Sequence, residues 1–491
     1  MILPKHAPFR KWFLLGLLVQ LVAAWFSVGY NHYDEHFQVL EFCNYKLGFS
    51  SASVLPWEFT TQCRCALQPF IAFCFCKALL SLHLYTPFFA AFLLRLMMGI
   101  SCWLVTCLLV NVLLPEFNTD RGKRLYVLGS FFFWFVPYCG VRFSAENVAG
   151  ILFFLALAII LQLHIYRVAK RNALLALAGL LLGFVFMFRL QIAFAFIGLA
   201  AWLLFYGKWN IRDYVIMVLS GLMAIGISML VDHWFYGAWV FTPYNYFAVN
   251  ILQHAAAKFG VFPWWYYFYL FFQYAVPPLS IVLLPLFFVG IWEKNRHLFS
   301  WVCIAFIVGH CFIGHKEMRF LLPMIFSFVF IICSGLDWLL YRYQVVWFFR
   351  WPLKLFMVMN GLMLLVKMLV PSHESIPYYK FIYEHSRKKS TILVCLDESP
   401  YHLVNLHSNF YRPPSQHEVI IHKQEELADI LKNANGQTVL FLNPEMQPIP
   451  LIAPYKKERL YCLLPDWVSL VNFNDWESRS YIWTIYRIDK L

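Results

Sequence analysis

An acidic pair, Asp34 and Glu35, is the first feature of the sequence whose residue types could do chemistry. The pair directly follows an apolar run and has His32, His36 and Gln38 beside it as hydrogen-bonding groups. A carboxylate in this place could act as a general base that deprotonates a hydroxyl group for attack. The alternative is a solvated boundary that ends the preceding helix. Because ionisable groups at membrane depth are costly and tend to be functional, we favour the catalytic interpretation.

A second cluster, the run HKEMR at 315–319, could bind an anion. Lys316 offers a compact point charge, Arg319 a planar fork of donors, and His315 a further donor. Together these side chains suit a phosphate group at a membrane surface. The alternative is a short solvated hairpin loop.

Two other features each allow two interpretations. The aromatic run FPWWYY at 262–267 is typical of an interfacial belt, which we favour, but could also be a carbohydrate platform. The C-x-C pairs Cys63/Cys65 and Cys74/Cys76 could bind a metal. Because the usual zinc spacing is C-x-x-C, we expect small packing residues there and no metal.

The chain that must position these groups is dominated by apolar residues. Of its 491 residues, 61% are hydrophobic and 13% are charged, which excludes a disordered chain and an ordinary soluble enzyme. The composition predicts a polytopic α-helical membrane protein with about 11 transmembrane helices, within a range of roughly 10–13. The expected spans are 12–30, 87–114, 125–139, 148–166, 173–187, 192–206, 213–236, 267–291, 299–313, 320–340 and 353–370. The run at 66–82 could span, re-enter or lie at the interface.

The net charge of +13 is distributed unevenly along the chain. Residues 1–370 hold 26 Lys and Arg against 12 Asp and Glu, whereas residues 371–491 hold 13 against 14. Nucleic acid is excluded as a partner because the soluble part lacks a basic excess. The positive-inside rule places the basic loops in the cytoplasm. The N-terminus is then cytoplasmic, behind an uncleaved first span, and the tail lies on the outer, luminal or periplasmic, face.

The division at residue 370 separates two expected domains. Residues 1–370 form a transmembrane catalytic domain whose first outer loop covers 31–65. Residues 371–491 form a small α/β domain on the outer face. Its expected strands lie at 391–396, 417–421, 438–442 and 481–488, and its helix lies at 424–434.

The outer face also collects Arg142 and Arg189, which could add to the anion site or pair with Glu146 and other acids. The sequence contains no Walker-type phosphate loop and no G-x-G-x-x-G motif. We therefore expect no soluble nucleotide sugar as a partner. A donor used on this face would have to be lipid-linked.

Six sequence motifs, in order between residues 30 and 325, resemble the family-22 glycosyltransferases of the GT-C superfamily, the mannosyltransferases of lipid-linked oligosaccharide and glycosylphosphatidylinositol (GPI) assembly. YNHYDEHFQVLEF is similar to their acidic H-P-D-E-x-x-Q loop, with Tyr33 in place of proline. LPWEF, RFSAEN and FRLQ resemble further family segments. The closest match is DHWFYGAWVFTPYNYFAVN, which leans toward the branch that adds the third GPI mannose, and HKEMRFLLP matches H-K-E-x-R-F-x-x-P.

The resemblance implies a GT-C fold and an inverting α-mannosyltransferase. The donor would be mannose linked to a polyprenyl or dolichyl phosphate, and the acceptor a lipid-linked glycan such as a GPI precursor. No cofactor is implied. Asp34 would carry over as the general base and Glu35 as its neighbour. The candidates for binding the donor phosphate are His315, Lys316, Arg319, Arg142 and Arg189. The acceptor or sugar-binding candidates are His32, Gln38, Tyr236 and Asn245.

A transporter or lipid flippase is the rival interpretation, because many spans and intramembrane charges would also suit one. The polar motifs favour the enzyme, since they gather on one side of the membrane rather than around a midplane site. The expected location is the endoplasmic reticulum membrane in a eukaryote or the inner membrane in a bacterium. Membrane lipids and the lipid-linked acceptor are the expected partners.

Overall fold

The structure is a computed structural model. It describes residues 9–207, 209–275, 280–343, 346–387, 391–403, 406–413, 417–434, 437–444, 455–476, 480 and 482–490. The chain divides into two compact units. The helical unit comprises Met1–Ser27, Trp57–Phe75 and Ala91–Val370, and the tail unit comprises Val28–Pro56, Cys76–Ala90 and Pro371–Leu491. Most of the first outer loop, which we assigned to the membrane part, thus groups with the tail.

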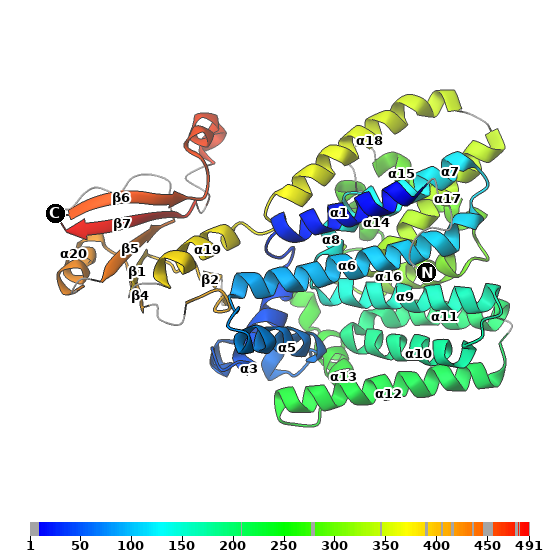
Figure 1. The fold of residues 1–491 in the computed structure, drawn as a ribbon, viewed down its shortest axis with the longest axis horizontal. Coiled ribbons are helices and arrows are strands. Elements are labelled where there is room, and N and C mark those ends of the chain that lie inside the picture. Colours follow the sequence, from blue (N-terminus) through cyan, green and yellow to red (C-terminus); the bar gives the residue numbers. More distant parts are fainter. Residues whose placement is uncertain are drawn as a thin grey trace. The chain divides into compact units, whose positions relative to one another are not determined.

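The helical unit is built from long apolar helices, several of which lie side by side in Figure 1. The α-helices of the unit, short ones included, are in chain order α1 (Arg10–Phe26), α4 (Trp57–Thr60), α5 (Leu67–Ser81), α6 (Pro87–Leu113), α7 (Asp120–Phe132), α8 (Phe135–Gly140), α9 (Ala145–Ile165), α10 (Arg171–Phe188), α11 (Ala193–Tyr206), α12 (Ile211–Tyr236), α13 (Thr242–Phe247), α14 (Tyr266–Tyr274), α15 (Ser280–Glu293), α16 (Leu298–Phe312), α17 (Ile325–Tyr343) and α18 (Val346–Leu369). Helices α5 and α6 extend into the tail unit.

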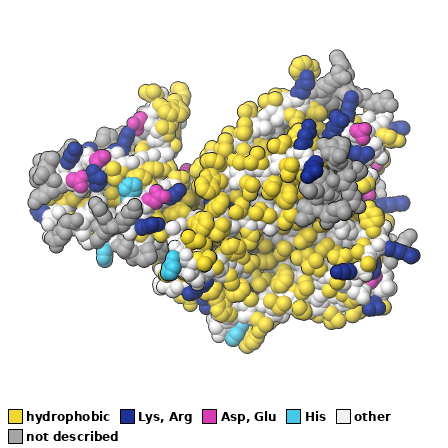
Figure 2. Space-filling view, in the orientation of Figure 1, with side chains coloured by type: hydrophobic (Ala, Val, Ile, Leu, Met, Phe, Trp, Pro, Cys, Tyr) yellow, Lys and Arg dark blue, Asp and Glu magenta, His cyan; other side chains and the backbone are white. Residues whose placement is uncertain are grey.

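The prediction of a polytopic helical membrane protein is confirmed. In the part of the chain that the structure describes, six helical segments are long and apolar enough to cross a membrane, and four shorter apolar helices accompany them. Figure 2 shows hydrophobic side chains over the face of the helical unit and Lys and Arg along one margin. This distribution suits a surface that faces lipid. The number of crossings stays a prediction.

Small residues bring neighbouring helices of the unit together. A Cβ atom added at Gly183 of α10 would collide with the backbone of Gly221 in α12, and one at Gly290 of α15 would collide with that of Ile331 in α17. Because lipid tails are as apolar as leucine, membrane helices associate through such close packing rather than through hydrophobic burial.

One expected span, 125–139, is broken in the structure between α7 and α8. The side chain of Asn360 on α18 fills this break. Its carbonyl oxygen accepts from the backbone nitrogen of Trp134 at 3.1 Å, and its amide donates to the carbonyl of Phe132 at 2.7 Å. A helix can break inside an apolar bundle when its freed backbone groups are paired in this way. The expected span 267–291 is likewise divided, into α14 and α15.

The tail unit combines short helices from the first loop with a five-stranded sheet. Its helical elements are α2 (Tyr33–Glu35), the π-helix η2 (His36–Leu40), α3 (Glu41–Lys46), α19 (Ser375–Ser386) and α20 (Gln424–Asn433). Its strands are β1 (Thr391–Leu396), β2 (His402–Leu403), β3 (Leu406–His407), β4 (His417–Ile421), β5 (Thr438–Asn443), β6 (Tyr455–Cys462) and β7 (Thr484–Lys490).

The sheet has the order β4-β1-β5-β7-β6 (Figure 1). Strand β1 runs parallel to β4 and β5, and β7 runs antiparallel to β5 and β6. Val394, Ile421 and Phe441 form its core with Leu427 of α20. The predicted strands and helix of the tail are therefore found within a few residues of their expected places. Residue 481, the predicted start of the last strand, lies outside the described residues.

Candidate functional site

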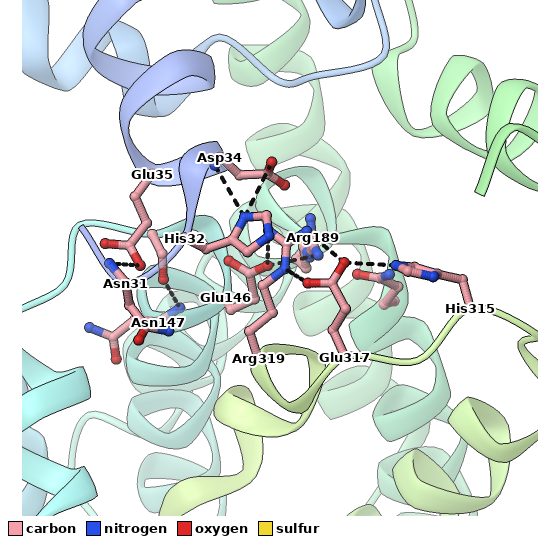
Figure 3. A network of polar contacts seen from close by, with 12 residues as sticks. Asn31, His32, Asp34, Glu35, Glu146, Asn147, Arg189, His315, Glu317 and Arg319 are labelled. Atoms are coloured by element: carbon pink, nitrogen blue, oxygen red, sulfur yellow. Dashed lines mark hydrogen bonds and ion pairs between the residues drawn. The ribbon is translucent and has the colours of Figure 1, made fainter. Parts of the chain in front are cut away.

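Asp34 and Glu35 lie on the short helix α2, which His32 caps. The Nδ1 atom of His32 accepts from the backbone nitrogen of Asp34 at 3.3 Å and lies 3.5 Å from its carboxylate. The Glu35 carboxylate accepts from the backbone nitrogen of Asn31 at 3.3 Å (Figure 3). The Asp34 side chain is 20% exposed. This carboxylate is thus held on a capped turn and remains accessible.

The chain after α2 continues as the π-helix His36–Leu40 before α3 begins at Glu41. Short π segments are rare and occur often at functional sites, because the extra residue in the turn reorients the side chains around it. Here the π-helix buries His36, Gln38 and their neighbours immediately after the acidic pair.

A buried polar node joins this loop to the tail within the tail unit. Glu41 accepts from His36 Nε2 at 2.9 Å and from the backbone nitrogen of Phe410 at 2.8 Å. Ser408 lies 3.0 Å from the same His36 nitrogen. Because a carboxylate only accepts, Nε2 of His36 carries the proton. His36, predicted as a polar neighbour of Asp34, is fully buried in this node, with Tyr411 stacked on its ring.

A second set of contacts in the tail unit joins the segment Val28–Tyr30, which precedes the acidic pair, to Ser372 and His373. Tyr30 stacks on His373 at 4.0 Å between ring centroids, and the backbone nitrogen of Ser372 donates to the carbonyl of Val28 at 2.7 Å. Gly29 has a φ of +94°, and a Cβ there would press on His373. Burial lowers the pKa of His373 to about 4.

The helical unit contains a cluster of arginines and glutamates around the 315–319 loop (Figure 3). Arg189 pairs with Glu146 at 2.7 Å, and both side chains are only 4% exposed. Arg319 lies 2.5 Å from Glu317 and 3.7 Å from Glu146. His315 lies 2.7 Å from Glu317. Three of the predicted phosphate candidates are therefore close together.

Helix ends place these charged groups. Ser144 caps α9 by accepting from the backbone nitrogen of Asn147 at 3.2 Å. Glu146 follows in the first turn, where the helix dipole favours a negative charge. Arg189 stands at the end of α10, and His315–Arg319 lies between the end of α16 and the start of α17.

The charges in this cluster nearly cancel. Two guanidinium groups face two carboxylates, and His315 is a fifth ionisable group beside them. Its hydrogen bond with Glu317 raises the pKa of His315 above the usual 6.5. The cluster therefore gains a net positive charge as His315 is protonated, and this charge favours the binding of an anion such as phosphate.

Two other phosphate candidates have backbone partners in the structure. Lys316 donates to the carbonyls of Ile313 and of Cys311, the latter at 3.2 Å, and burial lowers its pKa. Arg142 is buried and donates to Ser27 and to the backbone of the helix before it. The role of both side chains as phosphate ligands stays a prediction.

The sequence block at 232–250 holds the 62–66 segment of the helical unit. The Tyr236 hydroxyl donates to the carbonyl of Arg64 at 2.7 Å, and the Asn245 amide donates to that of Gln62 at 3.1 Å. Asp232 accepts from the backbone nitrogen of Ala66 at 2.6 Å. Asp232, Tyr236 and Asn245 thus each bind the backbone of the 62–66 segment, which is a structural reason for these polar residues in the block. Sugar binding by Tyr236 and Asn245 stays a prediction, as it does for His32 and the buried Gln38.

Within the described ranges, no three His, Cys, Asp or Glu side chains gather as metal ligands would. Cys63 is buried, and its burial raises the pKa of its thiol, which opposes thiolate chemistry.

The fold and these two polar sites define a polytopic membrane protein of the GT-C type. The structure resembles that of ArnT from Cupriavidus metallidurans bound to undecaprenyl phosphate, with a TM-score of 0.53 over 97% of both chains at 12% sequence identity. The chain belongs to the Alg9-like mannosyltransferase family, whose model matches residues 11–418. The resemblance seen in the sequence is thereby confirmed.

Relatives of this family include enzymes named for GPI assembly. The chain is 25% identical to GPI alpha-1,2-mannosyltransferase 3 of Xenopus laevis over 60% of its own length and 53% of the relative. It is 25% identical to GPI mannosyltransferase 3 of Drosophila melanogaster over 66% of its length and 56% of the relative. The chain thus spans about half the length of these curated relatives.

Proposed function

We propose that the protein is an inverting α-mannosyltransferase. Its donor is mannose linked to a dolichyl or polyprenyl phosphate, and its acceptor is a lipid-linked glycan such as a GPI precursor. The observation that carries this proposal is family membership over residues 11–418, a range that includes both the Asp34 loop and the Arg189 cluster.

The proposed reaction is one displacement at the anomeric carbon. Asp34 takes the proton of the acceptor hydroxyl, whose oxygen bonds to the anomeric carbon. The bond from that carbon to the phosphate oxygen breaks, and the lipid phosphate leaves with the electron pair. Guanidinium groups stabilise the charge on such a leaving group. Arg189 and Arg319 are assigned to it, and protonated His315 adds a donor.

Glu35 is assigned to orientation rather than to nucleophilic attack. A retaining double displacement needs two carboxyl groups on opposite sides of the anomeric carbon, about 5–5.5 Å apart. Glu35 is instead adjacent to Asp34 in the chain and is engaged with the backbone of Asn31. One base and one phosphate leaving group therefore suit inversion.

The remaining assignments follow from the same proposal. His32, Gln38, Tyr236 and Asn245 are candidates for contact with the acceptor or the transferred sugar. The protein acts in the endoplasmic reticulum membrane if its source is a eukaryote, or in the inner membrane if it is a bacterium. The N-terminus is cytoplasmic and the tail is luminal or periplasmic. The donor is not a soluble nucleotide sugar.

The test is reconstitution of the purified full chain in vesicles with dolichyl-phosphate-mannose and a mannosylated GPI-type acceptor. The proposal predicts one added mannose that α-mannosidase removes, with release of dolichyl phosphate. A flippase would instead move the lipid between leaflets and form no new glycoside. Movement of the lipid without transfer would overturn the proposal in favour of that alternative.

A further inference from the structure

A cavity of about 690 Å³ opens among α1, α7, α15, α17 and α18 of the helical unit. Its volume lies in the range of roughly 300–1,000 Å³ that is typical of ligand pockets. Aliphatic and aromatic side chains such as Leu18, Leu283 and Phe356 make its wall. The cavity therefore suits a hydrocarbon chain.

Two polar side chains in this wall, those of Asn360 and Cys333, already have partners in the backbone. Asn360 bonds to the backbone on both sides of the α7–α8 break, and the thiol of Cys333 lies 3.8 Å from the carbonyl of Leu125. The lining also holds the indole of Trp12 and, as its charged groups, the guanidinium groups of Arg121 and Arg124. Both are exposed, and neither forms an ion pair or side-chain hydrogen bond with a residue that the structure describes. The cavity is thus amphipathic.

The two arginines lie on one face of the first turn of α7, because residues three apart in a helix are neighbours. Helix α7 ends at Phe132, about 16 Å away at about 1.5 Å per residue, and the chain then passes through α8 to Ser144 and Glu146. Followed along the chain of the same unit, the arginine end of the cavity is therefore separated from the Arg189 cluster by the length of α7 and by α8.

We propose that this cavity binds an anionic glycerophospholipid, with an acyl chain against the apolar wall and the phosphate on Arg121 and Arg124. Hydrocarbon gains little by leaving the bilayer for an apolar wall, so the headgroup must select the ligand. Two guanidinium groups that have no carboxylate partner among the described residues favour a negative headgroup. The site is distinct from the proposed donor-phosphate site, and the proposal does not depend on transferase activity.

Two variants test the headgroup contacts and the acyl-chain contacts of the proposed site separately. The double variant Arg121→Ala/Arg124→Ala removes the headgroup contacts. Gly361→Leu fills the cavity: Gly361 lines it, and an added Cβ there meets no atom within 4 Å. Replacing glycine inside α18 also favours the helix, so this variant should remain folded. Arg167→Ala/Arg212→Ala, at two exposed arginines outside the cavity, is the matched control.

The experiment is native mass spectrometry of the full chain in detergent with phosphatidylserine and diacylglycerol of identical acyl chains. The wild type and the control should retain phosphatidylserine about tenfold more than diacylglycerol, and the arginine variant should lose this preference. Gly361→Leu should lose the bound lipid while its melting temperature is kept or raised. Wild-type retention of phosphatidylserine by either variant would overturn the proposal. So would complete displacement of phosphatidylserine by equimolar polyprenyl phosphate, which would make the cavity a carrier-lipid site.

Discussion

Replacing Glu41 by alanine tests how the tail supports the loop that carries Asp34. One oxygen of the Glu41 carboxylate accepts from both His36 and the backbone of Phe410, and the side chain is only 2% exposed. Alanine leaves the buried Phe410 amide without an acceptor, and His36 keeps only the Ser408 hydroxyl, 3.0 Å from its Nε2. Leaving a buried donor without its acceptor costs about 1–3 kcal/mol. We therefore expect Glu41→Ala to lower the free energy of unfolding of the tail unit by about this amount.

The assay is hydrogen exchange at the Phe410 amide, followed by mass spectrometry of the peptide that contains it. A loss of about 1–3 kcal/mol should accelerate exchange by roughly 5- to 150-fold. Glu41→Gln keeps an acceptor oxygen in place and should lose much less protection. The tail would not depend on this node if Phe410 exchanged at the wild-type rate in Glu41→Ala.

Three further predictions concern the other charged and close-packed groups. Arg189→Lys should raise KM for the lipid-phosphate donor about tenfold, because an ammonium group cannot replace the planar, two-bond pairing of the guanidinium group. An unchanged KM in donor titrations would exclude Arg189 from donor binding. Burial lowers the pKa of His373 to about 4, so its contribution to stability is complete above pH 6.5 and is lost as the pH falls toward 4. Melting temperatures across that window should fall more steeply in the wild type than in His373→Phe, and equal slopes would contradict this. Gly122→Ala should lower the free energy of unfolding by about 1–3 kcal/mol, since its Cβ would collide with the carboxylate of Asp337. Gly226→Ala, with open space around it, should not lower it. Equal stability of the two variants to chemical denaturation would refute the packing argument.

The elements of the fold could be predicted because their signals are local. Long apolar runs and the strand-like runs of the tail appear in short windows of sequence, and the structure contains helices and strands close to those places. The break between α7 and α8 could not be foreseen. It depends on Asn360, which lies 226 residues from its partner Trp134, and no spacing in the sequence links the two.

The contacts of the candidate site also divide into local ones, which the sequence can indicate, and distant ones, which it cannot. The contacts of His32 with Asp34, of His315 with Glu317 and of Glu317 with Arg319 each join residues two positions apart, so these residues stand together in the sequence motifs. The pairing of Arg189 with Glu146 was one of two alternatives that the residue types allowed, and the structure contains it.

Glu41 and Ser408 were missed by the sequence analysis. The only available signal for Glu41 was its acidity in an acid-poor part of the chain. Its tail partner Phe410 is 369 residues away, and Ser408 is 372 residues from His36. Contacts at such separations become visible only when the chain is folded.

The most direct test of the central claim is the rate of mannose transfer by Asp34→Asn, compared with Glu35→Gln as the adjacent control, in vesicles with dolichyl-phosphate-mannose and a mannosylated acceptor. Asparagine fits the same turn but cannot accept the proton of the acceptor hydroxyl. We expect kcat to fall by about 10²- to 10⁴-fold for Asp34→Asn, with the donor KM and the melting temperature unchanged, and a smaller loss for Glu35→Gln. Transfer by Asp34→Asn at the wild-type rate would contradict the assignment of Asp34 as the general base.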